Sequence, residues 1–162
     1  MNDNNNEKLQ CKWGFWYHSI DTKSWNKSSY TLLMNVNNIY DLKILIDYIK
    51  KENFHNSMFF LMKDGIFPNW EDTNNINGSC ISLKIPKNHI QDTWNQLIIQ
   101  LCTHTIFIDD YKSNVLNGIS ITPKKEFNIV KFWFKDNIKN LKSIIDTKPY
   151  ITNKNYVYKK NR

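Results

Sequence analysis

Arginine is almost absent from this chain of 162 residues: Arg162 is the only one, although Lys and Arg together number 22. A phosphate-binding site in the body of the protein would therefore use lysine ammonium groups, which act as point charges, instead of forked guanidinium groups. The formal net charge of +7 nevertheless favours an anionic partner such as a nucleic acid or a nucleotide phosphate.

Cysteine is also scarce and scattered. Cys11, Cys80 and Cys102 have no short spacing between them, and no histidine pairs with them at ligand spacing. This pattern argues against a disulfide framework and against a zinc site, so we expect no metal and no cofactor. No nucleophile, base and orienting residue form a recognisable motif, and we therefore expect a protein that is not an enzyme.

Long apolar runs are missing as well. No run approaches the roughly 18 residues that a membrane span requires, and Met1 to Asn6 lacks the hydrophobic segment of a signal peptide. We therefore expect a cytoplasmic protein without a membrane partner. The Asn-rich residues 1–8 predict a disordered arm, and residues 9–162 predict a single domain.

The hydrophobic pattern predicts both strands and helices. Strands are expected at Cys11–Ser19, Tyr30–Val36, Met58–Lys63, Gly78–Ile85, Gly118–Thr122 and Phe127–Phe134, with one or two more within Tyr150–Lys160. Helices are expected at about Ile39–Lys51 and Gln91–Leu101, and a third from an N-cap at Asp136 to before Pro149. About seven to eight strands and three helices without strict alternation indicate an α+β fold: a curved, mostly antiparallel sheet with the helices on its convex face.

A tight turn from Lys63 to Asp72, shaped by Gly65 and Pro68, presents Trp70 next to Glu71. An indole beside a carboxylate offers a flat stacking face and two acceptor oxygens, which match the ring and the N–H edge of guanine. A positively charged base such as 7-methylguanosine would add a cation–π attraction of about 0.5–2 kcal/mol. A core Trp followed by a surface Glu is the alternative interpretation of this dipeptide alone.

Two further tryptophans stand in unusual surroundings. Trp25 is isolated in the polar loop Asp21–Lys27, where a stacking role and a role as loop anchor are equally supported. Trp133 shares one face of its predicted strand with Lys131, and this mixture favours a half-open binding face over an interior.

These features combine into a longer pattern. It comprises Trp13-Gly-Phe-Trp16, Lys23-Ser-Trp25, the run Phe60–Asp72 with Pro68-Asn-Trp-Glu-Asp72, Asn75 with Gly78, Trp94 and Trp133. With this pattern the chain resembles the eukaryotic translation initiation factor 4E family, the mRNA cap-binding proteins, from about Leu9 to Trp133.

The resemblance implies a cupped sheet whose concave face binds the 7-methylguanosine cap of mRNA for translation initiation. In this family pattern Trp25 and Trp70 resemble the two stacking rings. Glu71 resembles the acceptor of the guanine N–H edge, and Trp133 resembles the ring that touches the N7-methyl group.

The phosphate-binding residues of the family are not retained. Where the family usually carries an Arg beyond the Gly pair and an Arg and a Lys in a hairpin, this chain has Cys80, Lys124 and Ile129. We therefore expect the cap phosphates to be bound by Lys124 and Lys131, together with Lys125.

The partner surface implied by the resemblance also differs. Lys43 stands where the family has a Trp that packs against a helix of initiation factor 4G and its inhibitors, and Asn95 stands where a Leu is expected. Leu9 and Ile99 persist from that surface. The resemblance implies either an altered helical peptide of a 4G-like scaffold or an inhibitor-like cap binder without a scaffold partner.

Two other functions fit parts of the sequence. A general single-stranded RNA-binding module would use lysines and exposed aromatics and would ignore the N7-methyl group. A cap-processing enzyme would need clustered carboxylates for a metal, for which Asp109-Asp110 alone is weak support. Selectivity for methylated cap analogues distinguishes cap binding from a general RNA-binding module. Metal-dependent turnover of a cap analogue would indicate a cap-processing enzyme.

Overall fold

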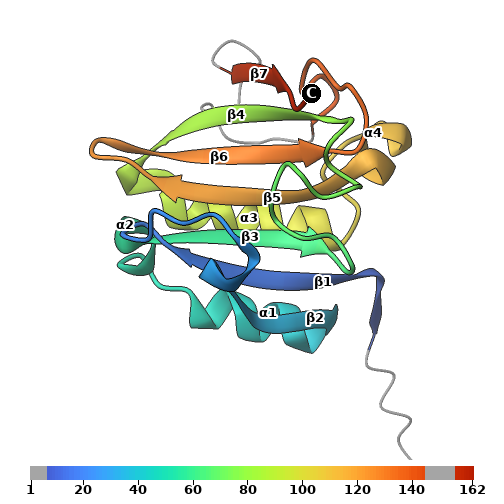
Figure 1. Ribbon diagram of the computed structural model, residues 1–162. Coiled ribbons are helices and arrows are strands. Elements are labelled where there is room, and N and C mark those ends of the chain that lie inside the picture. Colours follow the sequence, from blue (N-terminus) through green and yellow to red (C-terminus); the bar gives the residue numbers. More distant parts are fainter. Residues whose placement is uncertain (1–6, 145–155) are drawn as a thin grey trace, which may run out of the picture.

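Within residues 7–144 and 156–162, which the computed structural model describes, seven strands form one sheet (Figure 1). The strand order is β2-β1-β3-β5-β6-β4-β7, and each neighbouring pair is antiparallel. The strands are β1 (Lys8–Ser19), β2 (Tyr30–Asn38), β3 (Ser57–Lys63), β4 (Ser79–Pro86), β5 (Leu116–Pro123), β6 (Phe127–Phe134) and β7 (Tyr156–Lys160). The predicted α+β fold with a curved antiparallel sheet is confirmed.

Helices lie between the strands in sequence and cover one face of the sheet, with α3 behind it in Figure 1. They are α1 (Ile39–Tyr48), α2 (Asn53–Asn56), α3 (Ile90–Cys102) and α4 (Asp110–Val115). The side chain of Asn38 caps α1 by accepting a hydrogen bond from the backbone N–H of Asp41 at 2.9 Å. No helix in the described ranges is long and apolar enough to cross a membrane.

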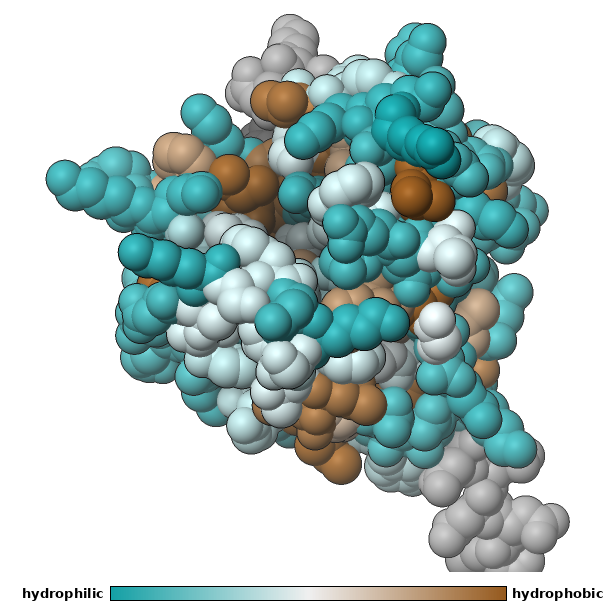
Figure 2. Space-filling model, viewed as in Figure 1, coloured by the Kyte–Doolittle hydropathy of each residue, from teal (hydrophilic) through white to brown (hydrophobic). Residues whose placement is uncertain are grey.

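The two faces of the sheet carry different cores. On the helix-covered face, strand residues such as Phe132 and Phe134 belong to one core with Leu45 of α1 and Trp94 of α3, all fully buried. The opposite face, called the open face below, carries a smaller cluster of Tyr30, Phe60, Met62, Cys80 and Trp133. In the space-filling view this face is mostly hydrophilic, with separate hydrophobic groups between (Figure 2). The alternation predicted for β6 therefore sorts its side chains between core and open face correctly.

The helix predicted after Asp136 is wrong for the described part of that segment. Residues 137–144 are not helical, because Ser79 on β4 competes for their backbone groups. The Ser79 hydroxyl donates to the carbonyl of Asp136 at 2.9 Å and accepts from the N–H of Ile138 at 2.9 Å. Ile138 and Leu141 are still buried, as predicted. Ile145 and Pro149 lie outside the described residues.

Other boundaries differ by a few residues. Strand β1 begins at Lys8, so Lys8 is not part of an arm, and residues 1–6 lie outside the described ranges. Helix α1 ends at Tyr48, three residues before the predicted end at Lys51. The short helices α2 and α4 were not predicted, because neither presents more than one or two turns of periodic sequence.

Candidate functional site

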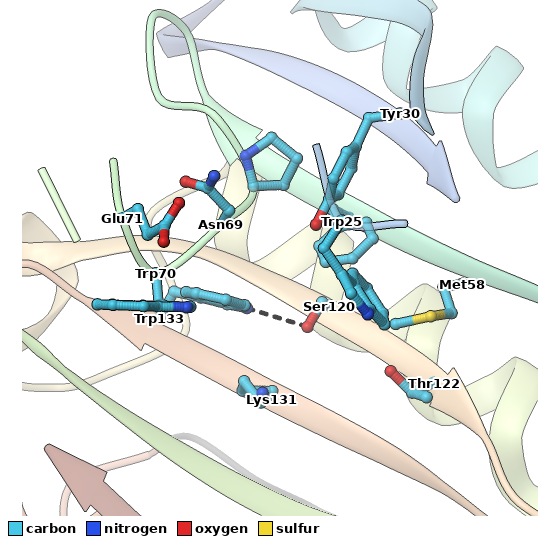
Figure 3. A pocket seen from close by; sticks show the side chains of 12 residues that line it. Trp25, Tyr30, Met58, Asn69, Trp70, Glu71, Ser120, Thr122, Lys131 and Trp133 are labelled. Atoms are coloured by element: carbon cyan, nitrogen blue, oxygen red, sulfur yellow. Dashed lines mark hydrogen bonds between the residues drawn. The ribbon is translucent and has the colours of Figure 1, made fainter. Parts of the chain in front are cut away.

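A cavity of about 390 Å³ opens on the open face of the sheet (Figure 3). It lies between the β1–β2 loop, the β3–β4 loop and strands β3, β5 and β6. Its lining residues are Trp25, Tyr30, Met58, Phe60, Pro68, Asn69, Trp70, Glu71, Ser120, Thr122, Lys131 and Trp133. The cavity thus brings together five predicted site residues, namely Trp25, Trp70, Glu71, Lys131 and Trp133.

Trp25 enters the cavity from the β1–β2 loop and is 55% exposed. Its indole stacks on the imidazole of His18, a residue of β1 that is fully buried. The Tyr30 ring packs against the same imidazole in a T-shaped arrangement, with ring centroids 4.7 Å apart. Both roles that the sequence left open for Trp25 therefore apply, because the ring anchors the loop and still presents surface to the cavity.

Trp70 enters from the β3–β4 loop, on the other side of the cavity in Figure 3, and is 50% exposed. The loop turns at Gly65, whose φ of +80° is a conformation that favours glycine. The Asp72 carboxylate then accepts hydrogen bonds from the backbone N–H groups of Phe67 and Asn74, and Asn69 accepts one from the N–H of Asp72. These bonds hold the segment that carries Trp70 in one conformation.

Asn75 fixes the same loop from inside the protein. It is fully buried, and its amide donates to the carbonyls of Phe67 and Asn69 at 3.2 and 2.8 Å. Its side-chain oxygen accepts from the amide of Asn117 on β5 at 2.9 Å. A buried amide with three partners is a rigid support, so the loop is tied to the sheet below it.

Glu71 presents an exposed carboxylate beside Trp70 and makes no hydrogen bond or ion pair with any described residue. Its charge reaches Tyr30 across the cavity. Burial, and secondly the charge of Glu71, raise the pKa of Tyr30 to about 12. The Tyr30 hydroxyl therefore stays protonated at neutral pH, while the Glu71 oxygens remain available to donors from a ligand.

Trp133 lies at the floor of the cavity and is 6% exposed, so it is more buried than the predicted half-open face implied. Its indole N–H donates to the Ser120 hydroxyl at 2.9 Å, the dashed line in Figure 3. The Lys131 ammonium lies 5.1 Å from the centre of the Trp133 ring. The positive charge of Lys131 therefore lies at the edge of a cavity floor whose other side chains are aromatic or polar.

Lys124 and Lys125 do not line this cavity. Both are exposed in the turn between β5 and β6, where the N–H of Lys124 bonds the carbonyl of Phe127. Among the described residues, no group of His, Cys, Asp and Glu is arranged to hold a metal ion.

The predicted partner residues lie away from the cavity. Lys43 on α1 and Ile99 on α3 are exposed, whereas Leu9 packs partly against the helix-side core. Asn95 is half-buried on α3. The sequence did not indicate the exposed apolar row on α1, which consists of Tyr40, Ile44 and Tyr48.

Several cavity residues carry no signal in the sequence. Met58, Phe60 and Ser120 alternate along strands like any sheet residue, and only the strand order brings them below Trp25 and Trp70. His18 could have been noticed as an ionisable residue directly after the aromatic run of β1, although its contact with Trp25 depends on the loop.

Curated relatives of this chain are initiation factors. The chain is 25% identical over 138 residues to the eukaryotic translation initiation factor 4E-3 of Caenorhabditis elegans, covering 79% of this chain and 53% of that protein. It is 33% identical over 92 residues to an initiation factor 4E homolog of Acanthamoeba polyphaga mimivirus, covering 56% of this chain and 33% of that protein. The chain therefore spans about half or less of the length of these relatives.

Solved structures share the fold. Ascaris suum eIF4E-3, solved with an m7G cap, has a TM-score of 0.70 at 22% identity, covering 82% of this chain and 75% of that one. A schistosome eIF4E, solved with m7GpppG and 4E-BP, has a TM-score of 0.72 at 16% identity, covering 82% and 74%. C. elegans eIF4E-3, solved with the 4E-binding protein Mextli and a cap analog, has a TM-score of 0.70 at 21% identity, covering 80% and 74%.

The comparison that decides the family spans nearly the whole chain. A sequence model of the family described as eukaryotic initiation factor 4E matches residues 8–160. The chain therefore belongs to the eukaryotic initiation factor 4E family, whose members are translation factors and not enzymes.

Proposed function

We propose that this chain binds the 7-methylguanosine cap of mRNA in the cavity between Trp25 and Trp70, and that it acts in translation initiation in the cytoplasm. The observation that carries the proposal is the convergence of two half-exposed indoles from separate loops on one cavity beside the Glu71 carboxylate. Family membership and the caps with which the Ascaris and schistosome structures were solved support it.

The cavity offers each group that a methylated guanine needs. Stacking on an aromatic ring contributes about 1–3 kcal/mol per base, and the positive charge of the methylated ring adds cation–π attraction to both indoles. The Glu71 carboxylate accepts the two N–H donors at the base edge, and such charge-assisted bonds are short and strong. Trp133, at the floor, contacts the methyl group.

The phosphates would leave the cavity over Lys131, the only lysine among the described residues that lines it. Lys124 and Lys125 lie in the nearby β5–β6 turn, so in this proposal they act on the phosphates at longer range. Neutralising both as Lys124→Gln and Lys125→Gln is expected to weaken binding less than Lys131→Gln. If the double variant, Lys131→Gln and the wild type have equal affinity and equal salt dependence, these lysines are not part of the site.

Tryptophan fluorescence during titration with 7-methyl-GTP and, in parallel, with GTP tests the proposal. Stacking on Trp25 and Trp70 quenches their emission, so we expect strong quenching by the methylated nucleotide and little by GTP. Trp25→Ala and Trp70→Ala should each remove most of this response. Equal responses to both nucleotides would favour the general single-stranded RNA-binding module instead, because such a module ignores the methyl group.

A helical peptide on the helix-covered face is the second part of the proposal. The Mextli and 4E-BP complexes of related structures support this kind of partner. Tyr40, Ile44 and Tyr48 are spaced four residues apart on α1 and are all exposed, which suits an amphipathic helix better than Lys43 does. If a standard 4G-type peptide binds strongly and Ile44→Glu does not change its affinity, the peptide-binding surface is not altered as proposed. An absence of any such binding would favour an inhibitor-like cap binder without a scaffold.

A further inference from the structure

Strand β2 forms one end of the sheet, at the bottom of Figure 1, and no strand in the described part of the chain pairs with its outer side. An edge strand presents unpaired N–H and C=O groups, which can pair with a strand of another chain. Proteins usually protect such an edge with charged side chains or proline. The other edge strand, β7, carries Lys159 and Lys160, whereas the nine residues of β2 include no charged residue and no proline. The edge at β2 therefore lacks this protection.

Two neighbouring leucines of β2 are exposed at this edge. Leu32 and Leu33 are 42% and 38% exposed. Leu32 pairs with Trp16 of β1, and both line a mostly apolar hollow of about 240 Å³ on the open face. Leu33 lines a hollow of about 230 Å³ on the helix-covered face, together with Tyr17 and Tyr48. Each face of the sheet thus has a hollow at this edge, with one leucine beside it.

The register of β2 against β1 limits where a further strand can pair. Thr31 pairs with Tyr17, whose side chain lies on the helix-covered face. Leu32 then lies on the open face and Leu33 on the helix-covered face. Before Met34 the register shifts by one residue, so a β-bulge breaks the alternation of side chains. A partner strand can therefore match both faces only over Thr31 to Leu33.

This stretch of β2 is complementary to itself. In an antiparallel pair of two β2 strands centred on Leu32, the Leu32 side chains of the two copies lie opposite each other on the open face. Thr31 of each copy then lies opposite Leu33 of the other on the helix-covered face, and directly opposite side chains are in contact. Because Trp16 and Tyr17 pair with Leu32 and Thr31 and line the two hollows, the leucines of one copy reach the hollows of the other.

Charge favours a second copy of this chain as the partner at β2. The formal net charge of each chain is +7, so two copies repel each other over much of their surface. At the uncharged strand β2 two copies can approach without placing lysines opposite each other. An acidic partner would instead gain most from lysine-rich parts of the surface, where opposite charges attract.

We infer that this chain forms a symmetric dimer in solution by antiparallel pairing of β2 with β2 of a second copy, centred on Leu32. Each copy has one such edge, so a two-fold axis beside Leu32 closes the assembly at two chains. The bulge after Leu33 keeps the paired stretch short. Interfaces below about 1,200 Å² are typical of weak complexes, so we expect a dissociation constant in the micromolar range or above. Dimerisation through β2 does not depend on cap binding.

Sedimentation velocity from micromolar to nearly millimolar concentration tests the dimer. We expect the wild type to shift from monomer to dimer, and to associate more strongly at higher salt, because salt screens the repulsion between two positive chains. Leu32→Asp should weaken the dimer by at least about tenfold, since it places two carboxylates opposite each other at the two-fold axis. Val157→Asp is the matched control, because Val157 is an exposed residue of the other edge strand. It should leave the association within about twofold of the wild type.

A pair of opposite charges tests the register and guards against a loss of folding. Leu32→Lys alone should also be monomeric, whereas an equimolar mixture of Leu32→Asp and Leu32→Lys should form a heterodimer, because opposite charges then meet at the axis. Native mass spectrometry identifies the heterodimer, and circular dichroism checks the fold of each variant. A wild type that stays monomeric at every concentration would overturn the inference and leave this edge to another partner. Equal association of Leu32→Asp and Val157→Asp would place the contact elsewhere, and a mixture without heterodimer would overturn the pairing centred on Leu32.

Discussion

The imidazole of His18 and the indole of Trp25 lie in parallel, with ring centroids 4.4 Å apart and planes within 6° of each other. The His18 Nε2 lies 2.9 Å from the carbonyl of Ser24 and 3.1 Å from the Ser29 hydroxyl. Because a carbonyl can only accept, Nε2 carries the hydrogen in this arrangement. One side chain therefore fixes both the ring of Trp25 and the loop backbone next to it.

Replacing His18 tests whether this stack prepares Trp25 for a ligand. His18→Ala should weaken 7-methyl-GTP binding by about tenfold, because the loop must then be ordered on binding at a cost of about 1 kcal/mol or more. His18→Phe keeps a ring under Trp25 but loses the hydrogen bonds, so it should recover part of the loss. Fluorescence titration measures both variants, and thermal unfolding checks that they fold. Wild-type affinity in His18→Ala would mean that Trp25 needs no support.

Removing the charge of Glu71 tests recognition of the base edge. Glu71→Gln keeps the shape of the side chain but replaces one acceptor oxygen with an N–H₂ donor that faces the donors of guanine. Hydrogen bonds to a charged group contribute about 1.5–3 kcal/mol, so the affinity for 7-methyl-GTP should fall by about tenfold or more. Isothermal titration calorimetry measures the change.

Glu126→Gln is the matched control for this experiment, because Glu126 is an exposed carboxylate in the β5–β6 turn and does not line the cavity. It should leave the affinity within about twofold of the wild type. A Glu71→Gln variant that binds as well as Glu126→Gln would exclude Glu71 from base recognition.

Asn75→Ala should destabilise the whole protein. The change removes three hydrogen bonds. The carbonyl of Phe67 keeps the N–H of Asn69, and the amide of Asn117 keeps the carbonyl of Asn74, so the carbonyl of Asn69 is the group that loses its partner. A hydrogen bond contributes about 0.5–1.5 kcal/mol and an unsatisfied buried group costs about 1–3 kcal/mol, so we expect a loss of about 3 kcal/mol in the free energy of unfolding. Urea denaturation measures it. Asn77→Ala, in the same loop but exposed, should cost less than about 0.5 kcal/mol, and similar losses in both variants would contradict this role of Asn75.

Alkaline pH should destabilise the fold through Tyr30. Its pKa is raised from 10.0 to about 12 in the folded protein, so the folded state binds this proton more tightly than the unfolded state does. The resulting stability is fully present below about pH 10 and is lost as pH rises towards about 12. Tyr30→Phe removes this group, and its unfolding free energy should fall less steeply over that range. Parallel curves for Tyr30→Phe and the wild type would show that Tyr30 does not contribute.

Regular elements were predictable where one face of the pattern is plainly apolar. Strand β6 begins and ends at Phe127 and Phe134, as predicted, because Val130, Phe132 and Phe134 alternate with polar or mixed positions. Helix α3 was predicted within one residue at each end, since Trp94, Leu97, Ile98 and Leu101 form one stripe. The segment after Asp136 shows the limit, because its backbone is bonded by Ser79, a residue far away in sequence.

In the candidate site, too, some residues were predictable from the local sequence and others were not. Trp70 and Glu71 stand out because glycine and proline turn chemistry is local and visible in the sequence. The support of Trp25 by His18 depends on how a polar loop folds back over β1, and no sequence period reports that. Lys159, which lines a neighbouring hollow with Trp70 and Lys131, was missed for another reason. The register of β7 against β4 decides whether this side chain lies on the open face, and a slip of one residue would have placed Lys160 there instead.

Asn161 connects the loop of Trp70 with the last strand of the sheet. Its amide donates to the carbonyl of Asn75, and its side-chain oxygen accepts from the Cys80 thiol at 3.3 Å. A ligand that orders the loop is therefore expected to reduce the freedom of the chain after β7 as well, without a change of shape. We expect the losses of 7-methyl-GTP affinity in Trp70→Ala and Asn161→Ala to be non-additive.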